Sequence, residues 1–201
     1  IPADRRLKGW LVTNPAYQPL PDRVALPAPL VHDGGHAVGT CSVALAHQAP
    51  GRLHRAFSVL LYDADGRVLL QQRAAVKTRF PAQWANTCCG HPAPGEPVEA
   101  AAAVRLSEEM GLATALTEVG VYRYHAEDSA TGRVEFEWDH VLVGKLTAGA
   151  PRPDPAEVAD YAWIHPDALR EKLIADPGSY TPWLAGVLDV AEQAVTGTSP
   201  R

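Results

Sequence analysis

Residues 90–112 read GHPAPGEPVEAAAAVRLSEEMGL. In this stretch a loop rich in glycine and proline leads into the clearest helical pattern of the chain. Pro97 suits the first position of a helix, the alanines that follow favour helix, and Gly111 is typical of the residue just past a helix C-terminus. The sequence therefore predicts a loop followed by a helix over residues 97–110, with two adjacent glutamates in its last turn.

Strand patterns lie on both sides of this helix. Residues 56–62 are apolar, residues 63–66 (DADG) carry a turn signal, and residues 67–73 (RVLLQQR) complete a predicted β-hairpin. Further predicted elements are strands over 119–125, 133–143 and 161–164 and helices over 166–174 and 183–195. Strands mixed with a few helices indicate an α/β or α+β layered domain.

The domain organisation is simple. The 201 residues are enough to bury one full hydrophobic core. Residues 1–30 are proline-rich and lack a lasting periodicity, so we expect an N-terminal arm there and a single catalytic domain over residues 31–201. Residues 74–94 are irregular, and long irregular segments inside compact domains usually carry function.

Charge and composition exclude several classes of protein. The net charge of -5 argues against a nucleic-acid or anionic-membrane binder, which needs a basic face. No apolar run reaches the roughly 18 residues of a membrane span, and no signal-peptide pattern opens the sequence. The three cysteines, Cys41, Cys88 and Cys89, are typical of a reducing compartment, so we expect a cytoplasmic protein. We also expect its partner to be a small molecule and not a nucleic acid or a membrane.

Two glutamates in one predicted strand are the first candidates for chemistry. Glu135 and Glu137 alternate, so both side chains share a face, and we expect Val134, Phe136 and Trp138 to face the core. Crowded carboxylates repel unless a cation or a shared proton offsets their charge. A solvated outer face explains the pair equally well when the strand is considered alone.

Three histidines are candidates for the same site. His47 and His54 flank a Pro-Gly turn, and His91 follows the adjacent cysteines. Each by itself is more often a surface or hydrogen-bonded histidine than a ligand. Together with the paired glutamates they would fill an octahedral site for Mn²⁺, Zn²⁺ or Mg²⁺, although the spacing alone does not establish it.

The opening stretch also resembles a known motif, the Nudix box, GX5EX7REUXEEXGU. The chain departs from it at Val104-Arg105, where the box has Arg-Glu. Hydrolases of the family use that glutamate in the metal cluster that activates water, so Arg105 argues against hydrolysis. The resemblance implies a layered α/β/α sandwich with a mixed sheet. The matching positions are Gly90, Glu96, Glu108, Glu109, Gly111 and Leu112.

A second resemblance covers the chain from about residue 39 to residue 183. Residues 86–92 read NTCCGHP, and several other short segments follow in order: 53–58 (LHRAFS), 73–77 (RAAVK), 122–124 (YRY), 135–137 (EFE), 157–158 (EV) and 181–183 (TPW). Their order and spacing resemble type I isopentenyl diphosphate isomerases. Any one segment is a weak signal, whereas the ordered set is a strong one.

The resemblance implies a role for each matching residue. Cys89 would lie on one face of the substrate alkene, Glu137 and Tyr124 on the other, and Trp183 under the carbon skeleton. Arg73, Lys77 and Arg105 would bind the diphosphate, and Cys88 has no assigned role. The implied ligands of one tightly held divalent metal are His47, His54, His91, Glu135 and Glu137, while Glu109 would hold a Mg²⁺ that bridges the diphosphate.

The implied reaction moves a double bond by protonation and deprotonation through a tertiary carbocation, which converts isopentenyl diphosphate to dimethylallyl diphosphate. Such a step needs an acid and a base on opposite faces in a dry pocket. Metal at Glu137 would help to set its proton affinity, and the Cys89 thiol would return a proton. We expect a monomer or weak homodimer.

Some positions depart from the isomerase pattern. The family usually has a lysine that contacts the diphosphate where this chain has Val43. The other departures are Phe80 for tryptophan, Ala85 for threonine, Phe136 for asparagine and the extra carboxylate Glu108. They leave open a relative that isomerises or cyclises another or longer prenyl diphosphate. A Nudix hydrolase, which would release phosphate, and a non-catalytic scaffold are the remaining alternatives.

Overall fold

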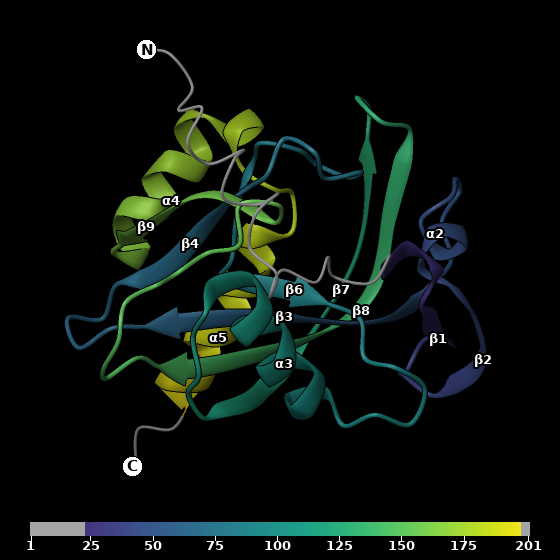
Figure 1. Cartoon of the computed structure of the whole chain (residues 1–201), viewed down its shortest axis with the longest axis horizontal. Coiled ribbons are helices and arrows are strands. Elements are labelled where there is room, and N and C mark those ends of the chain that lie inside the picture. Colours follow the sequence, from purple (N-terminus) through teal and green to yellow (C-terminus); the bar gives the residue numbers. More distant parts are fainter. Residues whose placement is uncertain (1–22, 198–201) are drawn as a thin grey trace, which may run out of the picture.

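The computed structural model describes residues 23–197 of the chain, and within them a mixed sheet carries helices on both faces (Figure 1). The strands are β1 (Pro27–Val31), β2 (Ala37–Ser42), β3 (His54–Tyr62), β4 (Val68–Arg73), β5 (Trp84–Ala85), β6 (Cys88–Gly90), β7 (Leu116–Asp128), β8 (Arg133–Lys145) and β9 (Val158–Ile164). The helices are α2 (Val43–Ala46), α3 (Val98–Met110), α4 (Pro166–Ala175) and α5 (Leu184–Gly197), with short 3-10 turns η1 (Arg23–Ala25) and η2 (Pro177–Ser179).

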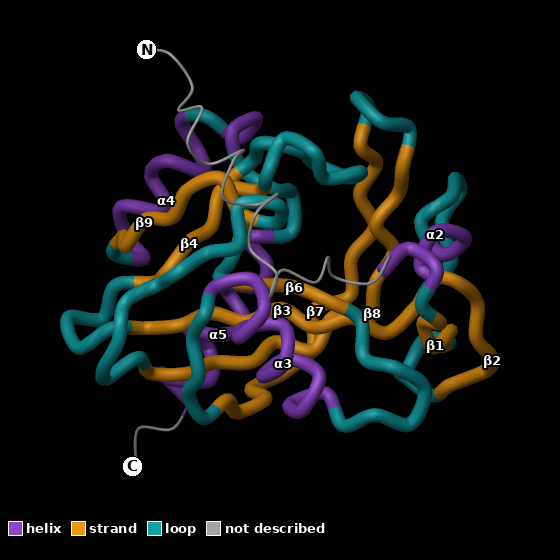
Figure 2. The backbone as a smooth tube through the Cα atoms, in the orientation of Figure 1, coloured by secondary structure: helices purple, strands orange, loops and turns teal. Residues whose placement is uncertain are grey.

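Strand β3 is the centre of the sheet. It pairs in parallel with β8, from His54 opposite Glu137 to Tyr62 opposite Lys145. Its other neighbours, β1, β4 and β6, are antiparallel to it. Strand β9 pairs with β4, and β7 pairs with β8 in a long hairpin whose tip extends beyond the other strands in Figure 2. The parallel β3–β8 pair makes the sheet mixed and sets a histidine beside a glutamate.

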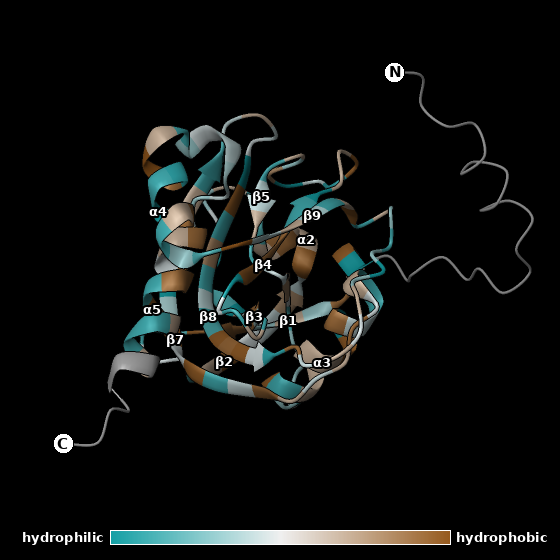
Figure 3. Cartoon of the chain, turned by 90° about the vertical axis from the view of Figure 1, so that its left-hand side faces the viewer, coloured by the Kyte–Doolittle hydropathy of each residue, from teal (hydrophilic) through white to brown (hydrophobic). Residues whose placement is uncertain are grey.

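Two apolar clusters fill the two faces of the sheet. Because side chains alternate along a strand, Phe57 and Leu61 of β3 pack with α3, whereas Leu60 packs with α5. Figure 1 shows α3 in front of the sheet and α5 behind it. In Figure 3, polar and apolar residues alternate along α4. The predicted layered α/β/α sandwich is therefore confirmed. None of the helices within residues 23–197 has the length and apolarity needed to cross a bilayer.

The predicted hairpin and helix are both present. The turn between β3 and β4 is held by Asp63, whose Oδ1 accepts the backbone N–H groups of Asp65 and Arg67 at 3.0 and 2.8 Å. Helix α3 ends at Gly111, which adopts the left-handed conformation (φ 64°). The helix begins one residue later than predicted, because Pro97 is its extended N-cap.

Within the irregular segment 74–94 lie two short strands that the sequence did not predict. Strand β5 pairs with β4, and β6 pairs with β3 from Cys88 opposite Val59 to Gly90 opposite Phe57. Strands of two and three residues are too short to show a periodicity of their own. They form here because longer neighbours offer them backbone partners.

The expected orientation of β8 was partly wrong. Val134 is buried, but Phe136 and Trp138 are only half-buried, while Glu135 and Glu137 are 3% and 7% exposed. The strand therefore turns its carboxylates, rather than its aromatic side chains, to the interior. The physical reason is that Glu135 and Glu137 meet cationic and imidazole partners there, which offset the cost of burying charge.

Most of the predicted N-terminal arm, residues 1–22, lies outside the described residues. From Arg23 the chain forms η1 and then β1, which pairs with β2 and meets β3 at Leu30 opposite His54. The last residues of the predicted arm therefore belong to the sheet.

The approach of α5 to β7 gives a test of the packing. A Cβ added at Gly186 would lie inside van der Waals contact of the Tyr122 ring, which stacks on Tyr124 with centroids 5.4 Å apart. We expect Gly186→Ala to destabilise the protein by about 1–3 kcal/mol in urea denaturation, although alanine favours helix. In a Tyr122→Ala background the same change should instead stabilise it by about 0.5–1 kcal/mol. Equal effects in both backgrounds would contradict this packing.

Candidate active site and metal centre

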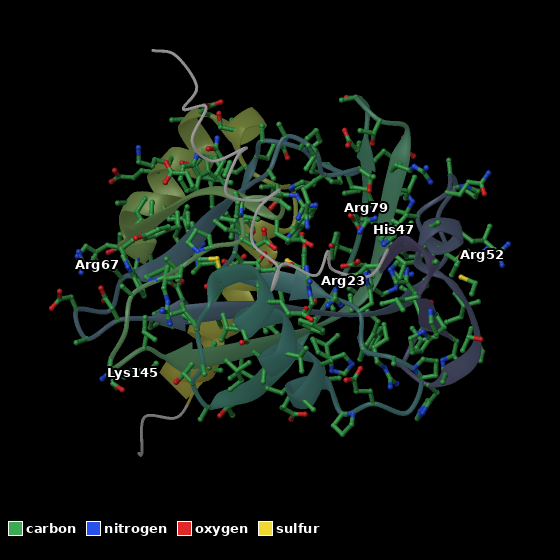
Figure 4. The ribbon with its side chains drawn as sticks, in the orientation of Figure 1. Arg23, His47, Arg52, Arg67, Arg79 and Lys145 are labelled. Carbon is green, nitrogen blue, oxygen red and sulfur yellow. The ribbon has the colours of Figure 1, made fainter. Side chains whose placement is uncertain are left out.

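A cavity of about 370 Å³ is lined by segments that lie far apart in the sequence, among them the loop after β4, strands β6 to β8 and the last turns of α3. In Figure 4, Arg23, His47 and Arg79 lie to the right of the centre of the view, away from Arg67 and Lys145 on its left. The predicted site residues that line the cavity are Arg73, Lys77, Cys89, His91, Arg105, Glu109, Tyr124, Glu135, Glu137 and Trp183.

Four of the five predicted ligands of the first metal come together beside this cavity. His47, His54, His91 and Glu137 each offer one donor atom, and these atoms all lie within 4.8 Å of one another. Donors on opposite sides of one ion with bonds of about 2.0–2.2 Å lie a little over 4 Å apart, so the spread suits one ion. His47 and His54 are 1% and 0% exposed, and His91 and Glu137 also line the cavity.

Backbone carbonyls fix the two buried rings for metal binding. Nδ1 of His47 lies 2.9 Å from the carbonyl of Val134, and Nδ1 of His54 lies 2.7 Å from that of Arg52. A carbonyl only accepts hydrogen bonds, so each Nδ1 carries a proton, and in the neutral ring each Nε2 then presents a lone pair. The backbone thus selects the tautomer that a metal ion requires.

The polar atoms that these rings present fit a cation. Nε2 of His54 is buried without a hydrogen-bond partner, and Nε2 of His47 faces Nε2 of His91 at 3.2 Å. Buried polar atoms normally have a partner, and the single proton that His91 Nε2 can carry does not serve both His47 Nε2 and Glu137 Oε1, 3.1 Å away. A divalent ion among these nitrogens satisfies both, so the residues present fit the predicted metal.

The fifth predicted ligand, Glu135, adjoins this group but is turned toward an arginine. Arg79 donates from Nε to Glu135 Oε1 at 2.8 Å, and the charge of Glu135 raises the pKa of Arg79 although burial opposes this. Oε2 of Glu135 lies 3.0 Å from His47 Nδ1 but makes no hydrogen bond. In this structure Arg79 supplies the positive charge that Glu135 needs.

Glu137 is held as a carboxylate. Burial by itself would raise its pKa, but the rings of His54 and His91, 3.4 and 3.1 Å from Oε1, bring the pKa well below its usual value. Burial lowers the pKa of His91 to about 4. An ionised carboxylate and a neutral imidazole are the forms that bind metal.

Glu137 also connects the metal group to the side chains predicted to contact the alkene. The Tyr124 hydroxyl donates to Glu137 Oε2 at 2.7 Å. Burial, and then the charge of Glu137, raise the pKa of Tyr124 well above its usual value, so the phenol keeps its proton. Its ring stacks on Trp183 with centroids 5.8 Å apart, which places a proton donor, a carboxylate and an aromatic face along one wall.

Cys89 faces the same cavity from β6 and is held by a buried amide. Its Sγ donates to Asn86 Oδ1 at 3.1 Å, and Trp183 donates from Nε1 to the same oxygen at 3.0 Å. Asn86 cannot turn over, because its Nδ2 donates to the carbonyls of Val59 and Cys88. One fixed oxygen thus positions both the thiol and the indole.

Burial keeps the thiol of Cys89 protonated. Burial, with the charge of Asp139 second, raises the pKa of Cys89 to about 12. Ser58 lies 3.7 Å from Cys89 Sγ and donates to Asp139 Oδ2 at 2.7 Å. Burial also raises the pKa of Asp139 well above its usual value. Cys89 is therefore a neutral thiol at neutral pH.

Cations and carboxylates alternate at the other end of the cavity. Lys77 pairs with Glu157, and Arg105 pairs with Glu109 and lies 3.4 Å from Glu157. The guanidinium of Arg73 donates to backbone carbonyls of the following loop. This end offers several exchangeable positive groups for an anionic ligand, beside a carboxylate, Glu109, for a second cation.

Sequence reasoning assigned no role to several side chains of the site. Asp139 follows Glu135 and Glu137 at the next alternate position of β8, so the strand periodicity would have identified it. Ser58 and Arg79 gave no signal, because their partners lie 81 and 56 residues away in the chain. Phe80 stands where the isomerase pattern has tryptophan, and its ring packs edge-to-face on Trp183 with centroids 5.2 Å apart.

The chain matches both a family model and individual known proteins. A NUDIX domain matches residues 52–184. An isopentenyl-diphosphate Delta-isomerase of Nocardia farcinica is 65% identical over 176 residues, which cover 88% of this chain and 100% of the relative. One of Streptomyces coelicolor is 49% identical over 174 residues, which cover 85% of this chain and 87% of the relative.

Solved structures agree on the fold. A Deinococcus radiodurans protein matches with a TM-score of 0.66 at 18% identity and covers 81% of this chain and 97% of its own. The NUDIX domain of a Shewanella oneidensis protein matches with a TM-score of 0.53 at 15% identity and covers 71% of this chain and 87% of its own. At such identities the likeness concerns the fold alone.

The metal centre can be tested through His91. We expect His91→Ala to weaken binding of Mn²⁺ or Zn²⁺ by at least about a hundredfold, because it removes a ligand and not only a supporting hydrogen bond. Metal content and the metal-induced rise in melting temperature measure the effect. Exposed His165, outside the donor group, provides the control variant His165→Ala. Unchanged affinity in His91→Ala would contradict the proposed site.

The protonated state of Cys89 predicts how the thiol reacts. Only thiolate is alkylated, and a pKa of about 12 leaves about one thiolate in ten thousand at pH 8. In a Cys88→Ala background without metal, alkylation of Cys89 by iodoacetamide should rise about tenfold per pH unit from pH 7 to 10, as followed by peptide mass spectrometry. A plateau below pH 9 would contradict the neutral thiol.

Proposed function

The chain belongs to the Nudix superfamily and, within it, to the isopentenyl-diphosphate Delta-isomerases, and from this membership we propose that it converts isopentenyl diphosphate to dimethylallyl diphosphate. One observation carries the proposal. A single cavity presents the Cys89 thiol together with the hydrogen-bonded pair of Tyr124 and Glu137. These are the proton donors and acceptor that movement of an unactivated double bond requires.

The chemistry explains why both groups are needed. One alkene carbon gains a proton and another carbon loses one, so the composition of the substrate does not change. A tertiary carbocation lies between the two steps. The gain and the loss occur on opposite faces, so one positioned group cannot perform both. We assign Cys89 to one face and Glu137 with Tyr124 to the other.

Trp183 and Asn86 support this arrangement. Trp183 is 3% exposed and lines the cavity, where its indole face stabilises a cation without reacting with it. Asn86 accepts hydrogen bonds from both Trp183 and Cys89, so it keeps the thiol and the aromatic face in register. Fixed positions of this kind hold the alkene between donor and acceptor.

The remaining side chains bind charge. In this proposal Glu109 holds a Mg²⁺ near the diphosphate, and the bound ions supply positive charge that offsets the carboxylates and the diphosphate. The diphosphate is clamped by Arg73, Lys77 and Arg105. The ligands of the tighter divalent metal are His47, His54, His91, Glu135 and Glu137.

Arg105 separates this proposal from hydrolysis. It occupies the position at which the Nudix box has a metal-binding glutamate, and here it pairs with Glu109 and approaches Glu157. A cation at this point removes a ligand of the cluster that activates water and adds a group that binds phosphate. The products should therefore retain their diphosphate.

A longer prenyl diphosphate is the second candidate substrate. Beside the polar groups, the cavity is lined by apolar side chains: Val24, Leu26, Pro27, Val43 and Val76. An apolar border of this kind suits a longer hydrocarbon, which the same acid would isomerise or cyclise. Turnover of C10 and C15 diphosphates, compared with the C5 substrate, distinguishes the two.

The cysteines indicate the cellular compartment of the enzyme. Cys41, Cys88 and Cys89 are free thiols, which persist in a reducing compartment, so we propose a cytoplasmic location. We also propose that the enzyme works as a monomer or weak homodimer.

The two-face mechanism predicts that neither Cys89 nor Glu137 is dispensable. We expect Cys89→Ala and Glu137→Gln each to lower kcat at least about a thousandfold with the C5 substrate, and the double variant to be little worse than either. Cys88 has no assigned part, so Cys88→Ala is the matched control.

Deuterium uptake separates chemistry from binding. In D₂O the wild type and Cys88→Ala should place deuterium in substrate and product, as read by mass spectrometry and NMR, whereas Cys89→Ala should not. Wild-type turnover by Cys89→Ala would overturn the two-face mechanism. The cyclase reading, which needs only the acid, would then be the better account.

A further inference from the structure

One wall of the cavity is built differently from the family pattern. Where the isomerases usually have a lysine, this chain has Val43, which is 5% exposed and lines the cavity. The N–H of Val43 donates to the carbonyl of Leu26 at 2.9 Å. The segment from Arg23 to Leu26 is therefore hydrogen-bonded directly to the position at which the isomerases usually have the lysine.

Arg23 reaches the same cavity from this segment. Arg23 is the first residue of turn η1. Its carbonyl accepts a hydrogen bond from the N–H of Leu26 at 3.3 Å, and its side chain is 30% exposed. Its terminal nitrogen pairs with Glu108, but its Nε is buried without a hydrogen-bond partner. A guanidinium at a cavity wall whose buried Nε–H has no acceptor is suited to bind an anion that offers several oxygens.

The charges around Arg23 point in the same direction. Burial lowers the pKa of Arg23, and the positive charge of nearby Arg105 lowers it further. Glu108, Glu109 and Glu157 offset the two guanidiniums in this structure. Two like charges facing one cavity are stabilised together by an anion that both contact, and a diphosphate carries several charged oxygens.

We propose that Arg23 binds the diphosphate of the substrate and supplies the positive charge that the lysine at position 43 supplies in related enzymes. The proposal rests on the proposed function, since it concerns the same ligand. It also gives turn η1 a part in the site, because this turn carries a substrate-binding side chain. Glu108 is then the partner that Arg23 and Arg105 share until the diphosphate takes its place.

The direct test is binding of inorganic pyrophosphate in the presence of Mg²⁺, measured by calorimetry. We expect Arg23→Ala to weaken binding about ten- to a hundredfold, as expected for loss of one charge-assisted contact. Arg67→Ala, which removes an ion-paired arginine far from the cavity, should leave binding unchanged. Arg23→Gln repeats the test with the side-chain length kept, and melting temperatures verify folding.

A purely structural role for Arg23 makes the opposite prediction for Glu108. If Arg23 served only to hold Glu108, then Glu108→Gln would weaken pyrophosphate binding as much as Arg23→Ala. Under the proposal, Glu108→Gln removes a competitor of the anion and should leave binding equal or tighter. Equal losses in the two variants would overturn the proposal.

Val43→Lys provides the rescue. In the Arg23→Ala background it should restore most of the lost affinity, about tenfold or more, whereas in the wild type it should add little, because one cation already serves the anion. With isopentenyl diphosphate, Arg23→Ala should raise KM and change kcat by less than about threefold. Additive effects of the two substitutions would overturn the shared role.

The outcomes also separate this proposal from the proposed function. A wild type that turns over isopentenyl diphosphate, combined with unchanged pyrophosphate affinity in Arg23→Ala, overturns the role of Arg23 alone. A wild type without isomerase activity, combined with weaker pyrophosphate binding in Arg23→Ala, overturns the proposed function and supports Arg23 as an anion-binding residue.

Discussion

The buried charge of Glu137 is the constraint from which the rest of the site follows. A carboxylate that is 7% exposed must be compensated, and the parallel pairing of β3 and β8 meets this need by setting His54 directly opposite it. His91 from the end of β6 and the Tyr124 hydroxyl complete its surroundings. The central pair of strands therefore organises the sheet and also positions His54 and Glu137 of the proposed metal centre.

The two ends of the cavity use opposite electrostatic arrangements. At one end, imidazole nitrogens and carboxylate oxygens come together as donor atoms for a cation. At the other, Lys77 and Arg105 are balanced against Glu109 and Glu157, so that an anion can replace the carboxylates. Between them lie the neutral Cys89 thiol and the indole of Trp183. A diphosphate with an apolar tail matches this order of charged and uncharged surfaces.

The Nudix scaffold is retained here while its chemistry is changed. Helix α3 keeps the glycine cap and the adjacent glutamates of the box, and its packing against β3 is that of an ordinary core element. The substitution lies at Arg105, which turns a ligand position into a cationic one. Because the helix is fixed by its apolar face, a change on its polar face alters the ligand without altering the fold.

The sequence by itself determined the hairpin at Asp63, the end of α3 at Gly111, the Nudix fold and the isomerase family, because turns, caps and short motifs are local in the chain. It also identified ten of the residues that line the cavity, through their resemblance to a family. Only the tertiary structure decided that Glu135 and Glu137 face inward, since their partners Arg79 and His91 are distant in sequence. The same holds for Asn86 between Cys89 and Trp183, and for Arg23 beside Val43. A hydrogen bond or ion pair between segments leaves no periodicity in either segment, so folding has to bring the partners together before it can be recognised.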